Sequence, residues 1–321
     1  MEWNSTSSKR RLEKKHFWKD AFTWQGAVTP IVMPQVIFFG LYGLLVGLVH
    51  EVYDWSALDR GPVEYTGAFL ALLLVLRTNG GYERWWEARK LWGGIVNQSR
   101  NLAIAGLTYG PRDSEWRERF VRWTATFSHV ARRSLRNERE MPELAPLLQD
   151  AGAAEHISRA QHMPTFVAYV LGSQLREAVE HGGMDRFAFL AADRERAQLL
   201  DHLGGCERIL KTPLPQVHTV KLRRFIVLYL LGLPIAVVGD LWWVPGLVTA
   251  LVAYPLLGID QIAVELQNPF SPKNLSHLPL EPICDTIQGN LLALLEAEDA
   301  LPPPRTFGSG PAFAQPWHTD G

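Results

Sequence analysis

The segment EYTGAFLALLLVLR, residues 64–77, decides the fold. Twelve uncharged residues, Tyr65 to Leu76, lie between Glu64 and Arg77. A helix of that length is about 18 Å long, whereas the hydrocarbon core of a bilayer is about 30 Å thick. Such a helix can lie at membrane depth only where its ends meet protein or water. The segment therefore predicts a re-entrant element, or a helix enclosed by other helices or by other subunits.

Longer apolar stretches lie on either side of this segment. Ala21 to Val49 contains no charged residue and is long enough to cross a bilayer. Its apolar run is too long for a signal peptide, and no small-residue cleavage site follows it. Near the other end, two uncharged stretches, Phe225–Gly239 and Leu241–Ile259, are separated by Asp240 and predict a helical hairpin with its turn at the membrane interface.

Charge predicts the topology of these four spans. The loop between the first two is acidic, whereas every basic cluster lies on the other side. The acidic residues are Glu51, Asp54, Asp59 and Glu64, against Arg60 alone. The basic residues are Lys9, Arg10, Arg11, Lys14, Lys15, Arg77, Arg84, Arg89, Lys90, Lys221, Arg223 and Arg224. The positive-inside rule then predicts four spans in the cell (plasma or inner) membrane with both termini cytoplasmic.

Composition is consistent with a chain of two unlike parts. Its 321 residues are 47% hydrophobic and 20% charged, with a net charge of −1 and a mean hydropathy of −0.04. A net charge near zero argues against nucleic-acid binding through a basic field. Two cysteines, Cys206 and Cys284, form no disulfide framework or metal-binding spacing. We predict no metal site and no cofactor.

Between the second and third spans lies a charged region that has helical periodicity throughout. The expected helical stretches are Tyr82–Thr108, Asp113–Arg139, Pro164–His181, which closes on Gly182-Gly183, and Asp185–Leu210. No strand-like alternation persists, so we predict an all-α protein. The predicted parts are a cytosolic N-terminal segment (1–24), spans one and two (25–82), a cytosolic helical region (83–222), spans three and four (223–262), a cytosolic C-terminal helical region (263–300) and a disordered tail rich in Pro and Gly (301–321).

Three motifs resemble those of the bestrophin family. RTNGGYERWWEARKLWGG (77–94) is similar to the signature after that family's second span and includes Arg84 and Trp85. ELQNPF (265–270), followed by LPL (278–280), is similar to the motif after the fourth span and includes Asn268, Pro269 and Phe270. GCERI (205–209) resembles bacterial members. The resemblance implies a homopentameric ion channel with a central pore, four membrane helices per subunit and a large cytosolic helical part.

The resemblance also implies two constrictions in that pore. Counting back from Arg84 puts the three apolar rings of the neck at Ala68, Leu72 and Leu76, which lie at i, i+4 and i+8 on one helix face. Such a neck gates by dewetting, although the alanine ring would be the widest. Apolar residues at this spacing are otherwise packed in a core. A cytosolic aperture is expected at Phe187, for which a packed core aromatic is the alternative.

The sequence says less about which ion passes and which stimulus activates the protein. Arg77 below the neck would favour anions, whereas Glu64 in the acidic loop would concentrate cations. We expect chloride or another anion from the family's animal members, with a Na⁺ channel as the alternative because bacterial relatives include cation channels. The family's calcium clasp appears as an acidic cluster after Asn-Pro-Phe, but residues 271–277 contain no carboxylate. We therefore expect no calcium activation.

A function of another class is a membrane-anchored enzyme or scaffold. The sequence contains no Gly-rich phosphate loop, nucleophile elbow or HExxH motif. We therefore predict that the protein is not an enzyme, and that its partners are copies of itself, the lipid bilayer and inorganic ions rather than nucleic acid.

Overall fold

The computed structural model describes residues 23, 27–55, 59–239 and 241–300. These residues form helices with no strand among them, as the sequence predicts. The helices are α2 (Thr29–Tyr53), α3 (Arg60–Tyr109), α4 (Ser114–Leu135), α5 (Leu144–Leu148), α6 (Ala151–Arg159), α7 (Met163–Glu180), α8 (Arg186–Lys211), α9 (Gln216–Val237), α10 (Val244–Glu265) and α11 (Leu280–Ala300). The predicted N-terminal segment (apart from Thr23), residue 240 and the predicted disordered tail lie outside the described residues.

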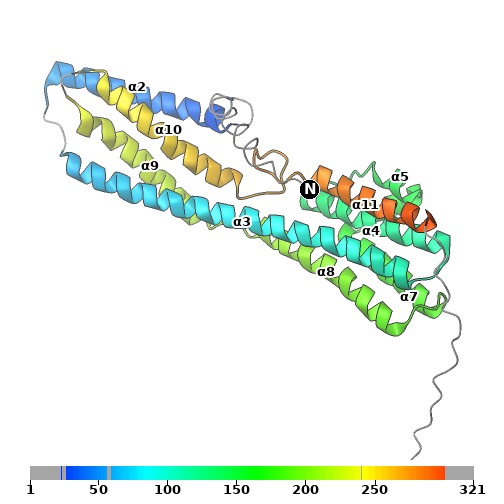
Figure 1. Ribbon diagram of the computed structural model, residues 1–321. Helices are drawn as coiled ribbons and strands as arrows, with labels where there is room; N and C mark the ends of the chain where they lie inside the picture. The colour runs from blue at the N-terminus through cyan, green and yellow to red at the C-terminus, as the bar shows by residue number, and fades with distance from the viewer. Residues whose placement is uncertain (1–22, 24–26, 56–58, 240, 301–321) are drawn as a thin grey trace, which may run out of the picture.

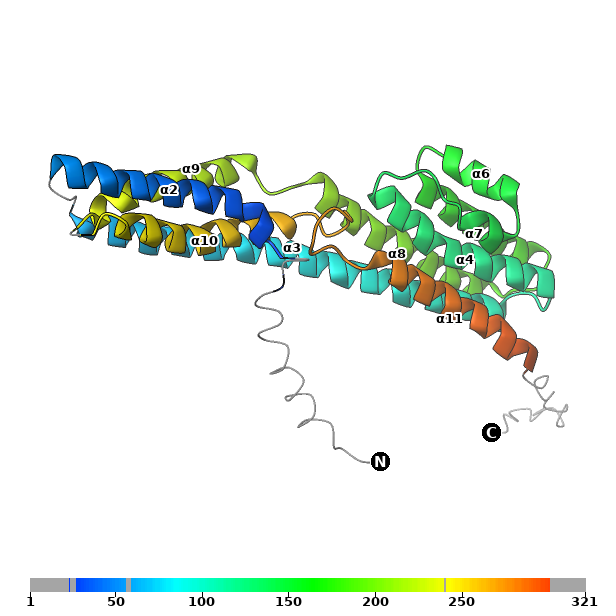
Figure 2. The ribbon, with the colours of Figure 1, turned by 90° about the horizontal axis from the view of Figure 1, so that it is seen from above.

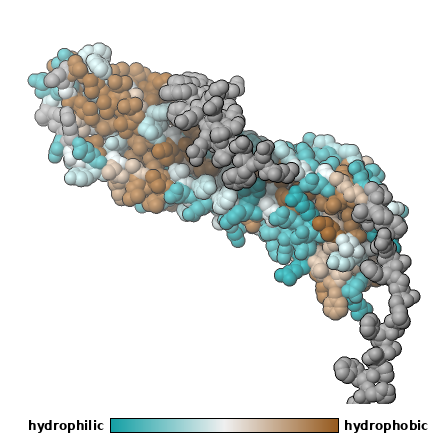
Figure 3. Space-filling model, viewed as in Figure 1, coloured by the Kyte–Doolittle hydropathy of each residue, from teal (hydrophilic) through white to brown (hydrophobic). Residues whose placement is uncertain are grey.

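The molecule is elongated and has an apolar half and a charged half, joined along α3 (Figures 1 and 2). The apolar half contains α2, α9, α10 and the first part of α3, and hydrophobic residues gather over it on the face seen in Figure 3. The charged half contains α4 to α8, α11 and the rest of α3 around a core that includes Trp92, Phe120 and Phe127. The two populations inferred from the mean hydropathy are therefore two ends of one structure.

Within the apolar half, α2 and α10 pack most extensively against each other. Glycine permits their close approach. A Cβ atom at Gly47 would lie 1.9 Å from the carbonyl oxygen of Trp242, and one at Gly43 would lie 2.8 Å from that of Pro245. Both helices are long and apolar enough to cross a membrane by length and composition, whereas α3 and α9 do not meet that criterion alone.

The second predicted span is not a separate short helix. Helix α3 continues unbroken for 50 residues, so the helical stretch expected from Tyr82 continues the second span and is not a separate helix. One of the two adjacent glycines in this helix has a packing role: a Cβ atom at Gly81 would lie 3.2 Å from the carbonyl oxygen of Ala263 on α10. At 1.5 Å per residue, α3 is about 75 Å long and runs through both halves.

The start and stop signals of the charged half were predicted more accurately. The Asp113 carboxylate caps α4, accepting hydrogen bonds from the backbone N–H groups of Glu115 and Trp116 at 3.3 and 3.2 Å. Asp185 caps α8 in the same way. Helix α7 ends just before Gly182-Gly183, as predicted, and Gly183 has a left-handed φ of 71°.

Candidate functional site

Helix α3 has two different faces where it runs through the apolar half. Leu70 and Leu74 are buried against the other helices of the chain. Leu72 and Leu76 are 56% and 58% exposed, and Ala68 is also exposed. The alternative that these three residues pack in the core of their own chain is therefore wrong. Their Cα atoms span about 12 Å along one helix face, so a single chain leaves an apolar strip uncovered.

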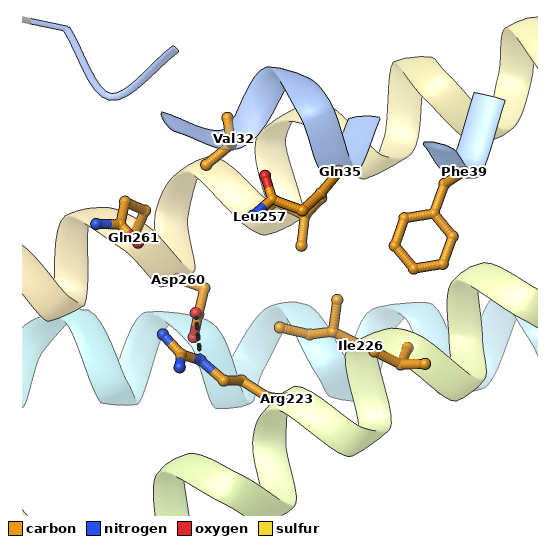
Figure 4. Close-up of a pocket in the computed structure, with 9 residues that line it drawn as sticks. Val32, Gln35, Phe39, Arg223, Ile226, Leu257, Asp260 and Gln261 are labelled. Atoms are coloured by element: carbon orange, nitrogen blue, oxygen red, sulfur yellow. Dashed lines mark hydrogen bonds and ion pairs between the residues drawn. The ribbon is translucent and has the colours of Figure 1, made fainter. Parts of the chain in front are cut away.

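Three charged side chains meet behind this strip. The Arg77 guanidinium donates through Nη1 to Oδ1 of Asp260 on α10. The Nε atom of Arg223 on α9 donates to the other carboxylate oxygen of Asp260 at 2.9 Å (Figure 4). The side chains of Arg77 and Asp260 are 1% and 9% exposed. We call Arg77, Asp260 and Arg223 the buried triad; it carries two positive charges and one negative charge.

The triad places Arg77 differently from the sequence-based interpretation. We expected this cation to lie directly below the neck, but its side chain points into its own chain and away from the exposed strip. Its Nε and Nη2 atoms have no hydrogen-bond partner in the described part of the chain. The sequence had a usable signal for the missing partners, because Asp260 directly follows the apolar run of α10 and Arg223 lies two residues before that of α9.

The other two predicted site residues are exposed and far apart along the chain's helices. Glu64 lies near the start of α3 with its side chain exposed. Phe187, in the first turn of α8, is 81% exposed, so the alternative that it packs in the core is wrong. Helix α8 runs antiparallel to α3, as contacts from Arg208 to Glu87 and from Asn101 to Glu195 establish. Phe187 therefore lies at the end of the charged half that is remote from Leu76.

The Arg84 side chain joins the two halves. Its guanidinium donates to the carbonyl oxygens of Thr212 at 2.7 Å, of Ile209 and, more weakly, of Gln267 at 3.4 Å. The first two acceptors lie at the C-terminal end of α8, where helix carbonyls lack partners within the helix, and the third follows α10. A planar guanidinium with several donors suits this position better than an ammonium group. The neighbouring Trp85 indole donates to the Ser276 carbonyl at 2.7 Å.

The Asn-Pro-Phe motif forms the loop between α10 and α11. The Asn268 side-chain oxygen accepts from the backbone N–H of Phe270 at 3.1 Å, and the ring of Phe270 is fully buried. The Pro269 carbonyl accepts from the N–H of Leu278 at 2.7 Å. The motif residues thus hold the α10–α11 loop and the contact between the two halves in place. Among the described residues, no group of three or more His, Cys, Asp or Glu side chains is arranged to hold a metal ion.

The chain is similar to known proteins over most of its length. Residues 8–293 match the family model described as "Bacterial/Fungal Bestrophin protein". The chain is 33% identical over 285 residues to a voltage-dependent anion channel-forming protein of Nostoc sp., covering 87% of this chain and 92% of that one. A protein of the same description from Synechocystis sp. is 32% identical over 89% of this chain and 93% of that one.

Solved structures agree with the sequence relatives. A crystal structure of a bacterial bestrophin homologue from Klebsiella pneumoniae superposes with a TM-score of 0.73 and 28% identity. The match covers 81% of this chain and 98% of that one. Both halves of the molecule therefore belong to a known fold.

Proposed function

Since the chain belongs to the bacterial and fungal bestrophin family, a family of membrane channels and not of enzymes, we propose that it forms a passive channel for monovalent ions. In the proposed assembly, five copies surround a central pore and each contributes α3 to the wall. The four helices of the apolar half cross the membrane, and both termini are cytoplasmic. Helix α3 is shielded from lipid by its neighbours in this assembly, so it does not need a full apolar span.

The observation that carries this proposal is the exposed apolar strip of α3. Ala68, Leu72 and Leu76 project from a helix whose opposite face is packed in its own chain. Five such strips around an axis would make a narrow, water-repelling neck that gates by dewetting. Phe187, exposed at the distant end of α8, would form a second aperture by the same arrangement.

We propose that the permeant ion is chloride or another small anion. Two observations support this choice: relatives in Nostoc and Synechocystis are described as anion channel-forming, and the buried triad behind the neck has a net positive charge. The alternative, a Na⁺ channel, is favoured by the exposed acidic residues Glu51, Asp54, Asp59 and Glu64 at the other end of the apolar half, which would concentrate cations.

The test is ion flux through purified protein in liposomes. We expect the wild type to conduct, and the double variant Leu72→Ala, Leu76→Ala to conduct faster because smaller side chains widen the neck and favour its wetting. Leu45→Ala is the matched control, since Leu45 is equally exposed but lies on α2. Reversal potentials in a NaCl gradient, with each ion replaced in turn by an impermeant one, distinguish Cl⁻ from Na⁺. Absence of flux in every protein would favour a scaffold or an enzyme.

A further inference from the structure

One surface groove on α9 is used neither by the neck nor by the joint between the halves. It has a volume of about 450 Å³ and is lined by Val220, Arg223, Arg224, Val227 and Leu228. Its lining is almost wholly apolar, and the two arginines contribute mainly the carbon stems of their side chains to it. Val227 and Leu228 are 43% and 65% exposed. A neighbouring pocket of about 390 Å³ between α2, α9 and α10 shares Arg223 and Val227 as lining residues (Figure 4).

The order of residues along α9 separates charge from apolar surface. Residues four apart lie on the same helix face, so Arg223 is followed by Val227, and Arg224 by Leu228. Helix α9 enters the apolar half from the charged half. The two guanidinium groups therefore lie near the boundary between the halves, and the two aliphatic side chains lie one turn deeper. A ligand that fits both must have an anionic head and an apolar tail.

Both arginines have side-chain N–H groups available to a ligand. Arg223 gives its Nε to Asp260, and half of its side chain remains exposed. Arg224 is exposed and forms no ion pair within the part of the chain that the structure describes. Basic side chains at the cytoplasmic surface of a membrane attract anionic lipids, and basic pockets between membrane helices bind lipid head groups.

We propose that an anionic phospholipid binds in this groove, with its phosphate on Arg223 and Arg224 and one acyl chain along Val227 and Leu228. The proposal rests on the membrane-spanning arrangement of the proposed function. A free phosphate would satisfy the arginines but would leave the apolar floor exposed. A lipid covers both parts, and its tail continues naturally into the bilayer beside α9.

The test is lipid retention by the purified oligomer, measured by native mass spectrometry. We expect phosphatidylglycerol to be retained in preference to phosphatidylcholine with the same acyl chains, and retention to fall at least several-fold in Arg224→Gln. Arg223→Gln is a second variant, but it also disturbs the buried triad, so Arg224→Gln carries the test. Arg176→Gln, which changes an arginine that is 71% exposed on α7 in the charged half, is the matched control and should retain the lipid.

Four results would overturn the proposal. Equal retention of both lipids would exclude recognition of the head-group charge, and unchanged retention in Arg224→Gln would place the lipid elsewhere. Displacement of the lipid by millimolar inorganic phosphate or glycerol phosphate would identify a free-anion site instead. Disulfide cross-linking of Leu228→Cys between subunits would mean that a second copy covers the groove. Because retention is measured without ion flux, its failure is distinguishable from failure of the channel proposal.

Discussion

Asp260→Asn is the sharpest perturbation of the apolar half, because one carboxylate serves two arginines. Asp260 accepts from Arg77 through one oxygen and from Arg223 through the other. The substitution keeps the size of the side chain and removes its charge. Arg223, half exposed, can turn to solvent or to a lipid head group. Arg77 cannot, because only 1% of its side chain is exposed.

The expected cost follows from this asymmetry. Breaking a buried ion pair by removing one partner costs about 3–5 kcal/mol, since it leaves an uncompensated buried charge. The Nε and Nη2 atoms of Arg77 already lack partners in the described structure, so no second acceptor is in place to take over. The asparagine amide oxygen still accepts one hydrogen bond, which favours the lower end of the range. We expect Asp260→Asn to lose about 3 kcal/mol per subunit.

Thermal unfolding of the purified oligomer in detergent measures this loss. At about 2 °C per kcal/mol for a long chain, the midpoint should fall by about 6 °C. The double variant Arg77→Met, Asp260→Leu is the control, because a well-packed apolar pair often replaces a buried ion pair at little cost. It should recover most of the loss. A midpoint within about 2 °C of wild type for Asp260→Asn, or a double variant no better than the single one, would refute the assignment of the triad.

Two further predictions concern packing and pH. Gly47→Ala should lower the unfolding midpoint, because its Cβ atom would lie 1.9 Å from the Trp242 carbonyl oxygen. Overpacking of this kind costs about 1–3 kcal/mol. Gly232→Ala is the control and should leave the midpoint unchanged, because no atom lies within 4 Å of its Cβ position. The hydrogen bond from Arg136 lowers the pKa of Glu281 from its ordinary 4.5 to about 2. The stability that this pair contributes is present above pH 4.5 and is lost as the pH falls towards 2, so midpoints measured from pH 6 to pH 3 should fall less steeply in Glu281→Gln than in the wild type.

The sequence predicted the elements whose signals are local. The uncharged runs identified α2 and the α9–α10 hairpin, and Asp113 and Asp185 marked helix starts because a carboxylate before a helix satisfies its free N–H groups. The long α3 was missed since glycine weakens a helix by only about 1 kcal/mol. Gly81 lies close against α10, and no local pattern reveals that contact.

The direction in which the Arg77 side chain points could not be predicted from the neighbouring sequence either. Its neighbour Leu76 is exposed and Arg77 is buried, because successive residues on a helix point about 100° apart. Which of the two faces outward depends on Asp260, 183 positions away in the chain. A charge beside an apolar run therefore cannot be assigned to a pore wall until the partner is known.

This placement changes how ion selectivity can arise. The exposed face of α3 from Tyr65 to Tyr82 carries no charged side chain, since Arg77 is turned inward. The net charge of the triad instead lies behind the helix, about 10 Å from the opposite face. A unit charge at that distance contributes about 1.7 kcal/mol at an effective dielectric constant of 20. In the proposed pentamer, five such charges would lower the barrier for anions and raise it for cations.

Selectivity should therefore respond to the triad although none of its members lines the proposed neck. Asp260→Asn raises the net charge of each triad by one unit, so the reversal potential in a NaCl gradient should shift towards the chloride equilibrium potential. Arg77→Met removes one positive charge and should shift it the opposite way. Both are measured on the fraction of protein that assembles, with Leu45→Ala as the control. If neither variant moves the reversal potential, the field of the triad does not reach the pore, and the acidic residues near Glu64 become the better source of selectivity.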